Sequence, residues 1–238
     1  MYCEKYIISI NKLSNYFICA SLFYLPICFY LKSLKIKKNN YYDIHYTLWN
    51  LGLALFSIWG SYIGINLFIK NINENSLKNV ILDISLIKED FCVPGYYFTI
   101  SKIFELGDTI LILLRGRQLR FIQYYHHLIT LLYCWYSHQY NQYNSSNEMF
   151  SIMNFFIHSI MYSWYFLSSL NIRTSKLIKN IISILQTIQM FLGMYIIIIC
   201  VYYGGWFNKD KYNSSFAFIM YGSYIYLFGK MLYKNIKY

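Results

Sequence analysis

Residues 181–203 read IISILQTIQMFLGMYIIIICVYY and contain no charged side chain. A helix needs about 20 consecutive apolar residues to cross the hydrocarbon core of a bilayer. A helix on the surface of a soluble domain instead keeps one polar face toward water. This segment therefore predicts a membrane-spanning helix.

Five similar segments precede it and one follows, each bounded by charged or turn-forming residues. The seven predicted spans lie at about residues 13–31, 46–69, 91–114, 121–140, 149–170, 181–203 and 216–233. The chain has 238 residues, of which 57% are hydrophobic and only 13% are charged, too few charges to cover a soluble domain of this size. The expected fold is a single all-α domain over residues 1–238, a polytopic membrane protein of seven transmembrane helices.

The first predicted span follows two lysines, as the apolar region of a signal peptide also does. Its long apolar run is followed by Lys32, Lys35, Lys37 and Lys38, where cleavage would require small residues. We therefore expect this segment to be retained as a span.

Lys and Arg side chains are unevenly divided between the two ends of the predicted bundle. Thirteen follow the first, third, fifth and seventh spans, whereas seven precede the first span or follow the second and sixth. Cytosolic connections of membrane proteins carry the excess of Lys and Arg. This distribution predicts a lumenal or external N-terminus and a cytosolic C-terminus. The same distribution explains the net charge of +11. The positive side chains set the orientation in the membrane and can bind phosphate groups of lipids or ligands, so they do not indicate nucleic-acid binding.

Polar and ionisable residues gather in one layer of four predicted spans. An ionisable group in a span costs about 2.5–3.5 kcal/mol even on a mild insertion scale, so it needs a partner, a cavity or a function. The members are Lys102, Glu105 and Asp108; Gln123, His126 and His127; Asn154, His158 and Tyr162; and Gln186 and Gln189. At about 1.5 Å per residue, this layer lies in the cytosolic half of the bundle. It predicts a chamber that opens to the cytosol, with apolar space beyond it for a hydrocarbon tail.

Two of these features have a structural as well as a functional interpretation. Lys102 and Glu105 are three residues apart, so they can form a structural ion pair. The basic residues at the cytosolic rim can bind phosphate groups or serve as topology signals alone; they include Arg115, Arg117, Arg120 and Lys176. Three histidines without an HxxxH pair are too few for a membrane di-iron site, so we expect no metal.

The six cysteines predict neither a disulfide scaffold nor a zinc site, because four lie in apolar stretches and none forms a CxxC pair. Cys92 begins the third span and Cys200 lies near the end of the sixth, so the predicted topology puts both on the lumenal side. An oxidising compartment would allow two such thiols to pair. Whether Cys92 and Cys200 are bridged is left open.

Four short motifs follow one another in the third to sixth predicted spans. They are residues 102–109, KIFELGDT; residues 123–127, QYYHH; residues 154–162, NFFIHSIMY; and residues 186–190, QTIQM. Together they resemble the KxxExxDT, HxxHH, NxxxHxxMY and glutamine-rich motifs of the ELO family of very-long-chain fatty acid elongases. Four motifs in family order are far more specific than any one alone.

The resemblance implies condensation of a long-chain fatty acyl-CoA with malonyl-CoA to a 3-ketoacyl-CoA, CoA and CO2, with no cofactor. It implies His126 as the nucleophile or acyl carrier, His127 and His158 as acid/base or oxyanion-stabilising groups, and Asp108 as the residue that orients a histidine. The residues with implied structural or orienting roles are Lys102, Glu105, Gln123, Asn154, Tyr162, Gln186 and Gln189. The implied CoA-binding residues are Arg115, Arg117, Arg120 and Lys176.

The resemblance also implies a substrate tunnel within the seven helices and a place in the endoplasmic reticulum membrane. Its implied partners are membrane lipid, the ketoacyl reductase, dehydratase and enoyl reductase of the elongation cycle, and a second copy of the chain. The first His of HxxHH is Gln123 here, and an amide cannot shuttle a proton or carry an acyl group. A non-catalytic lipid-binding or regulatory homologue is therefore an alternative. A seven-span receptor shares the topology but does not explain the buried histidines.

Overall fold

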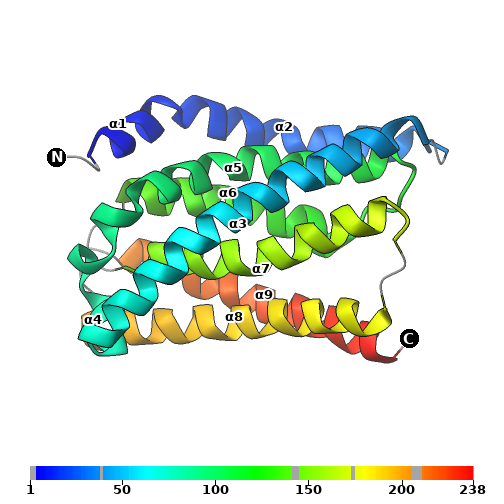
Figure 1. The fold of residues 1–238 in the computed structure, drawn as a ribbon. Coiled ribbons are helices and arrows are strands. Elements are labelled where there is room, and N and C mark those ends of the chain that lie inside the picture. Colours follow the sequence, from blue (N-terminus) through cyan, green and yellow to red (C-terminus); the bar gives the residue numbers. More distant parts are fainter. Residues whose placement is uncertain (1–3, 38–39, 141–144, 173–174, 205–210, 238) are drawn as a thin grey trace.

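The computed structural model describes residues 4–37, 40–140, 145–172, 175–204 and 211–237, and in these residues every regular element is helical (Figure 1). The long helices are α2 (Ser14–Ser33), α3 (Asp43–Glu74), α5 (Lys88–Leu114), α6 (Phe121–Tyr140), α7 (Ser146–Ser169), α8 (Lys176–Gly204) and α9 (Lys211–Lys237). The short helices are α1 (Glu4–Lys12) and α4 (Leu77–Leu82), with 3-10 turns at Asn40–Tyr42 and Ile84–Leu86.

The predicted all-α fold is confirmed, and each predicted span coincides with one long helix. Within the described ranges, α2, α3 and α8 are long and apolar enough to cross a membrane by length and composition. Most of the polar layer lies on α5, α6 and α7, and its polar residues make these three helices less apolar than α2, α3 and α8. The chain is a membrane protein whose more polar long helices hold the candidate site.

The long helices run side by side, so the two termini drawn in Figure 1 lie at opposite ends of the bundle. The end that holds α4 and the N-terminus is called the α4 end, and the other is called the C-terminal end. Helices α1 and α2 lie along one side, α8 and α9 lie along the opposite side, and α3, α5, α6 and α7 lie between them. This arrangement brings the polar faces of α5, α6 and α7 into the interior.

Helix α3 packs closely along α7 because two glycines of α3 leave room for side chains of α7. A Cβ atom on Gly60 would overlap the ring of Phe155, and a Cβ atom on Gly64 would lie 2.7 Å from Ile152 Cγ1. Small residues let helix backbones approach closely in membranes, where association depends on packing. This contact holds in place the helix that carries Asn154.

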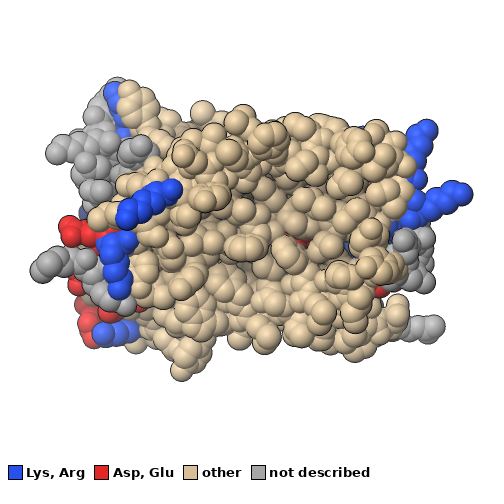
Figure 2. Space-filling view, turned by 90° about the horizontal axis from the view of Figure 1, so that it is seen from above, with Lys and Arg blue, Asp and Glu red and all other residues tan. Residues whose placement is uncertain are grey.

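Charged side chains gather at the two ends of the bundle. Figure 2 shows a broad face between those ends that is almost free of Lys, Arg, Asp and Glu. Exposed acidic residues at the α4 end include Glu74, Asp83 and Glu89, and exposed basic residues at the C-terminal end include Lys35 and Arg117. An uncharged belt between charged ends is typical of a bundle embedded in a bilayer. Three residues counted for the predicted orientation, Lys38, Arg173 and Lys209, lie outside the described residues.

The question left open for the cysteines has a definite answer. Cys92 is disulfide-bonded, whereas Cys200 is a buried thiol, so these two residues are not joined to each other. Helix α8, which carries Cys200, packs mainly against α9, α7 and α4 rather than against α5, where Cys92 lies. Two cysteines on the same predicted side of a membrane therefore need not be neighbours in the bundle.

Candidate active site

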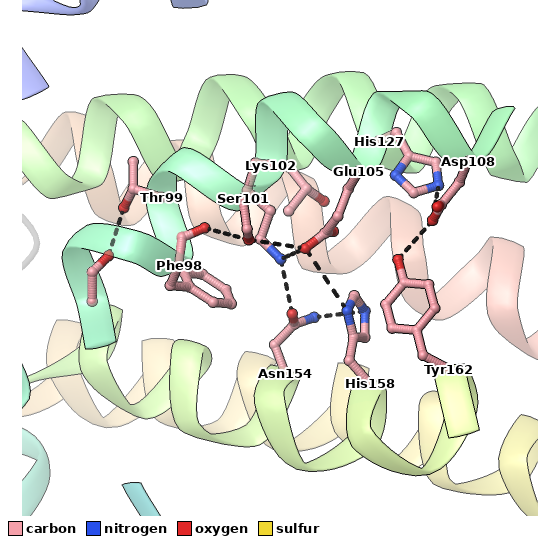
Figure 3. Close-up of polar contacts among 12 residues, drawn as sticks. Phe98, Thr99, Ser101, Lys102, Glu105, Asp108, His127, Asn154, His158 and Tyr162 are labelled. Carbon is pink, nitrogen blue, oxygen red and sulfur yellow. Dashed lines mark hydrogen bonds and ion pairs between the residues drawn. The ribbon is translucent and has the colours of Figure 1, made fainter. Parts of the chain in front are cut away.

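An ion pair between two residues of α5 lies in the centre of the bundle. Lys102 Nζ is 2.7 Å from Glu105 Oε1, and the two residues are 2% and 4% exposed. Lys102 also donates a hydrogen bond to Asn154 Oδ1 of α7 at 2.9 Å, and Ser101 Oγ donates to Glu105 Oε1 at 3.1 Å (Figure 3). Both charges are thus paired and also hydrogen-bonded, which offsets the cost of removing them from water.

His158 joins this network in a defined tautomer. Because an ammonium group only donates, Asn154 faces Lys102 with its oxygen and faces His158 with its amide nitrogen. The distance from Asn154 Nδ2 to His158 Nε2 is 3.2 Å, so Nε2 accepts and the ring proton is on Nδ1. That Nδ1 lies 3.9 Å from Glu105 Oε1. The charge of Lys102 therefore determines, through Asn154, which ring nitrogen of His158 carries the proton.

Asp108 is held by donors from two other helices. Trp49 Nε1 of α3 donates to Asp108 Oδ1 at 2.6 Å, and the Tyr162 hydroxyl of α7 donates to Asp108 Oδ2 at 2.6 Å. His127 Nε2 lies 3.9 Å from the same Oδ2, and Figure 3 shows the carboxylate between His127 and Tyr162. Short hydrogen bonds to both oxygens fix the carboxylate. A carboxylate fixed in this way can orient the ring of His127.

His126 lies on α6 with an unpaired ring nitrogen. Its Nδ1 is buried and has no hydrogen-bond partner among the described residues. The ring lies against Tyr224 and Phe228 of α9, with centroid distances of 4.8 and 5.5 Å. The Tyr224 hydroxyl donates to the backbone carbonyl of His126 at 3.1 Å. A buried nitrogen without a partner is costly and needs an explanation, and a role in chemistry is one.

This histidine lines a narrow cavity between α5, α6, α7, α8 and α9. His126, Asn154 and Gln189 line the part of the cavity in the polar layer, and Cys134, Met190 and Met220 line its walls farther toward the α4 end. Three predicted site residues, Asp108, His127 and His158, are not among the lining residues. His158 contacts the lining residue Asn154, and the ring of His127 lies 5.7 Å from that of His126, centroid to centroid. The arrangement combines a nucleophilic nitrogen and an amide donor on one narrow cavity.

The other two glutamines of the predicted layer lie at its edge. Gln186 Nε2 is 3.1 Å from Met161 Sδ, a weak acceptor. Gln123 is half-buried on α6, one turn before His126. The structure therefore brings Gln189 to the cavity, but it does not place Gln123 or Gln186 on its lining.

The predicted basic rim divides into two groups. Arg115 Nε is 2.7 Å from Asp43 Oδ1, and its guanidinium lies 4.1 Å from the ring centroid of Tyr46. Arg115 therefore ties the end of α5 to the start of α3. The other three predicted residues, Arg117, Arg120 and Lys176, are exposed at the C-terminal end.

Sequence reasoning missed Trp49, Tyr224 and Phe228. Trp49 had a detectable signal, because a buried indole N–H usually needs an acceptor. Tyr224 and Phe228 lie in the last span, where aromatic residues at helical spacing are typical of ordinary packing. Their contacts with His126 could be found only by bringing α9 against α6.

The sequence model of the GNS1/SUR4 family, ELO, matches residues 10–238. Among similar proteins, "Very long chain fatty acid elongase 6" of Drosophila melanogaster is 35% identical over 198 residues, which are 79% of this chain and 61% of that protein. The Homo sapiens protein of the same name is 33% identical over 76% of this chain and 66% of its own length. "Putative fatty acid elongase 3" of Caenorhabditis elegans is 34% identical over 91% of this chain and 69% of its own length. The chain thus spans about two thirds of the length of the relatives that it matches.

Proposed function

The chain belongs to the ELO (GNS1/SUR4) family, and from this premise we propose that it is a fatty acid elongase. It condenses a long-chain acyl-CoA with malonyl-CoA to a 3-ketoacyl-CoA, CoA and CO2. The observation that carries this proposal is the buried, unpaired Nδ1 of His126 on a cavity that extends away from it into the bundle. A condensing enzyme needs an acyl acceptor beside a channel for the alkyl chain.

The first step transfers the acyl group to His126. With its proton on Nε2, the neutral ring has a lone pair on Nδ1 that attacks the thioester carbonyl. A C–N bond forms and the C–S bond breaks, so the thiolate of CoA leaves and takes up a proton, and the acylated ring gives up its Nε2 proton in exchange and stays neutral. His127 is placed to supply that proton, because Asp108 lies 3.9 Å from its Nε2 and stabilises its protonated form. The resulting acyl-imidazole keeps the acyl group activated.

The second step forms the carbon–carbon bond. Malonyl-CoA loses CO2, and the electron pair of the broken C–C bond becomes an enolate. The enolate attacks the acyl carbonyl, and the C–N bond to His126 breaks to release the 3-ketoacyl-CoA. The ring takes up one proton from solvent, which restores the neutral imidazole for the next turnover. Asn154 has two amide hydrogens, and only one is used by His158. The other is available to stabilise the oxyanion in the cavity that Asn154 lines.

The surroundings of the site suit a membrane enzyme with soluble CoA substrates. Seven transmembrane helices enclose the tunnel, the N-terminus is lumenal and the C-terminal end faces the cytosol of the endoplasmic reticulum membrane. The CoA groups bind at that end, near Arg117, Arg120 and Lys176, which are exposed there. The product passes to a ketoacyl reductase, a dehydratase and an enoyl reductase.

The test uses the purified protein with radiolabelled malonyl-CoA and acyl-CoAs of different lengths. We expect a labelled 3-ketoacyl-CoA and one CO2 for each condensation. Binding of acyl-CoA without consumption of malonyl-CoA would favour the non-catalytic homologue and refute the proposed reaction.

The exposed basic residues of the rim can be tested together. Neutralising Arg117, Arg120 and Lys176 to Gln is expected to raise KM for both CoA substrates about tenfold and to reduce its dependence on salt, with a smaller effect on kcat. The physical reason is the loss of charge-assisted hydrogen bonds to phosphate. A matched control neutralises three exposed lysines at the α4 end, Lys12, Lys70 and Lys211. If the rim variant misinserts while its KM values stay unchanged, these charges are topology signals only.

Gln123 offers a test of the one departure from the family motif. Gln123→His restores the HxxHH pattern one turn before His126, so kcat/KM is expected to equal or exceed the wild-type value. Gln123→Ala is the control that removes the amide without adding a ring. A collapse of activity in Gln123→His, with activity retained in Gln123→Ala, would contradict the expectation.

A further inference from the structure

Trp49 of α3 binds the carboxylate of Asp108 from outside the four sequence motifs. Its indole Nε1 donates a hydrogen bond to Asp108 Oδ1 at 2.6 Å. The other oxygen, Oδ2, accepts from the Tyr162 hydroxyl at 2.6 Å and lies 3.9 Å from His127 Nε2. The oxygen that faces His127 and the oxygen that Trp49 binds are therefore the two ends of one carboxylate.

A carboxylate with a donor on only one oxygen is free to turn. The terminal torsion of an Asp side chain is broad, so rotation of the carboxyl group costs little. With donors on both oxygens, one from α3 and one from α7, the group has a single orientation. In that orientation Oδ2 faces His127 (Figure 3). The bond from Trp49 is therefore one of two that fix the direction in which Asp108 presents its charge.

Gly107 provides the space that this bond requires. A Cβ atom on Gly107 would lie 2.6 Å from Cζ2 and 2.9 Å from Cη2 of the Trp49 ring, closer than real Cβ atoms approach other atoms. The indole thus lies directly against the α5 backbone, one residue before the carboxylate that it binds. An alanine at position 107 would displace the ring, and with it the N–H that Asp108 accepts.

A second contact between α3 and α5 fixes the register of the two helices. They run in opposite directions (Figure 1), and Arg115 Nε of α5 is 2.7 Å from Asp43 Oδ1 of α3. Asp43 precedes Trp49 by six residues, about 9 Å of helix. Arg115 follows Asp108 by seven residues, about 10 Å. Because these lengths match, the ion pair and the indole–carboxylate bond belong to one alignment of the two helices.

We propose that Trp49 is a positioning residue, which acts on His127 through Asp108. Gly107 is required for this action because it leaves room for the indole. The inference rests on the proposed function, because it takes His127 as the proton donor to the departing thiolate of CoA. Trp49 is not among the residues that line the cavity. Its loss should therefore lower kcat and leave KM for both CoA substrates unchanged.

The experiment combines two substitutions with their double variant. Trp49→Phe keeps an aromatic ring and removes the N–H, whereas Gly107→Ala keeps the N–H and displaces the ring. Each should lower kcat per folded molecule about tenfold, which is part of the roughly 10²–10⁴-fold that general acid catalysis contributes. The double variant should also lose about tenfold and not about a hundredfold. The reason is that a phenyl ring ends short of the indole atoms that the new methyl group would meet.

Two control variants change the same residue types on the same helices. Trp59→Phe removes another indole of α3. Gly95→Ala adds a methyl group to α5 at an ordinary contact distance, 3.7 Å from Phe91 Cδ1. Both should keep the wild-type kcat.

A spectroscopic measurement tests the contact without relying on activity. In protein with isotope-labelled tryptophan, observed by NMR in detergent, the indole N–H signal of Trp49 is identified by its loss in Trp49→Phe. Gly107→Ala should shift this signal toward the position of an indole N–H without an acceptor. A signal that does not move would show that the bond does not need Gly107.

The outcomes separate this inference from the proposed function. If wild-type protein condenses acyl-CoA with malonyl-CoA but Trp49→Phe keeps its kcat, Trp49 does not position the site while the proposed function stands. The same conclusion follows if the two single losses multiply in the double variant, or if Gly107→Ala shifts the indole signal without lowering kcat. If wild-type protein condenses no acyl-CoA, the proposed function fails and the positioning role fails with it.

Discussion

His126→Ala is expected to abolish condensation, and His158→Ala is expected to leave less than a tenth of the wild-type activity. The first change removes the only nitrogen that, in the described part of the chain, is both buried without a partner and on the cavity lining. The second frees the amide of Asn154, which His158 Nε2 holds at 3.2 Å. A tenfold loss corresponds to about 1.4 kcal/mol of barrier.

The measurement is turnover of radiolabelled malonyl-CoA per folded molecule, with folding checked by thermal unfolding in detergent. His45→Ala is the matched control, because His45 is an exposed histidine on α3.

A second measurement separates the role of His126 from that of His158. Wild-type protein incubated with acyl-CoA alone should release CoA and retain a labile acyl group, and His126→Ala should do neither. Retention of more than a tenth of the activity by either variant would show that its assigned role is wrong.

Lys102→Met is expected to give the largest loss of stability. It leaves Glu105 as an unpaired charge at 4% exposure in the middle of the bundle, and removing one partner of a buried pair typically costs about 3–5 kcal/mol. For a chain of this size, each kcal/mol lowers Tm by about 2–4 °C, so a fall of about 10 °C is expected. Differential scanning of the purified protein in detergent measures it.

The double variant Lys102→Met, Glu105→Gln is the control for this prediction. It removes both charges and keeps an amide that can accept from Ser101, so most of the lost Tm should return. Activity should not return with it, because Asn154 has lost the donor that fixes the orientation of its amide. Equal Tm values for the single variant and the wild type would mean that the pair does not stabilise the fold.

The helices and the inward face of α5 could be predicted because both follow from local periodicity. Apolar runs of about 20 residues predict spanning helices in any bundle. Spacing of three residues puts Lys102, Glu105 and Asp108 on one helix face, and their cost in lipid predicts that this face turns inward. The ion pair of Lys102 with Glu105 could be predicted because the two residues lie within one helical turn.

The partners across helices could not be predicted in this way. Trp49 precedes Asp108 by 59 residues and Tyr224 follows His126 by 98, and no periodicity connects positions so far apart. Arg115 looked like its basic neighbours in the sequence, but the start of α3 brings Asp43 to it. The unpaired nitrogen of His126, too, could be recognised only after every neighbouring donor and acceptor had been placed.

The sequence by itself determined that the chain is a membrane protein of long apolar helices and that the face of α5 with Lys102 and Glu105 turns inward, because these depend on one helix at a time. The tertiary structure alone decided which nitrogen of His158 carries the proton and which histidine faces the cavity. Each of these depends on the contact of two or more helices. Such contacts are set by the fit of side chains such as Gly193 against Tyr221, and that fit exists only once the helices are packed.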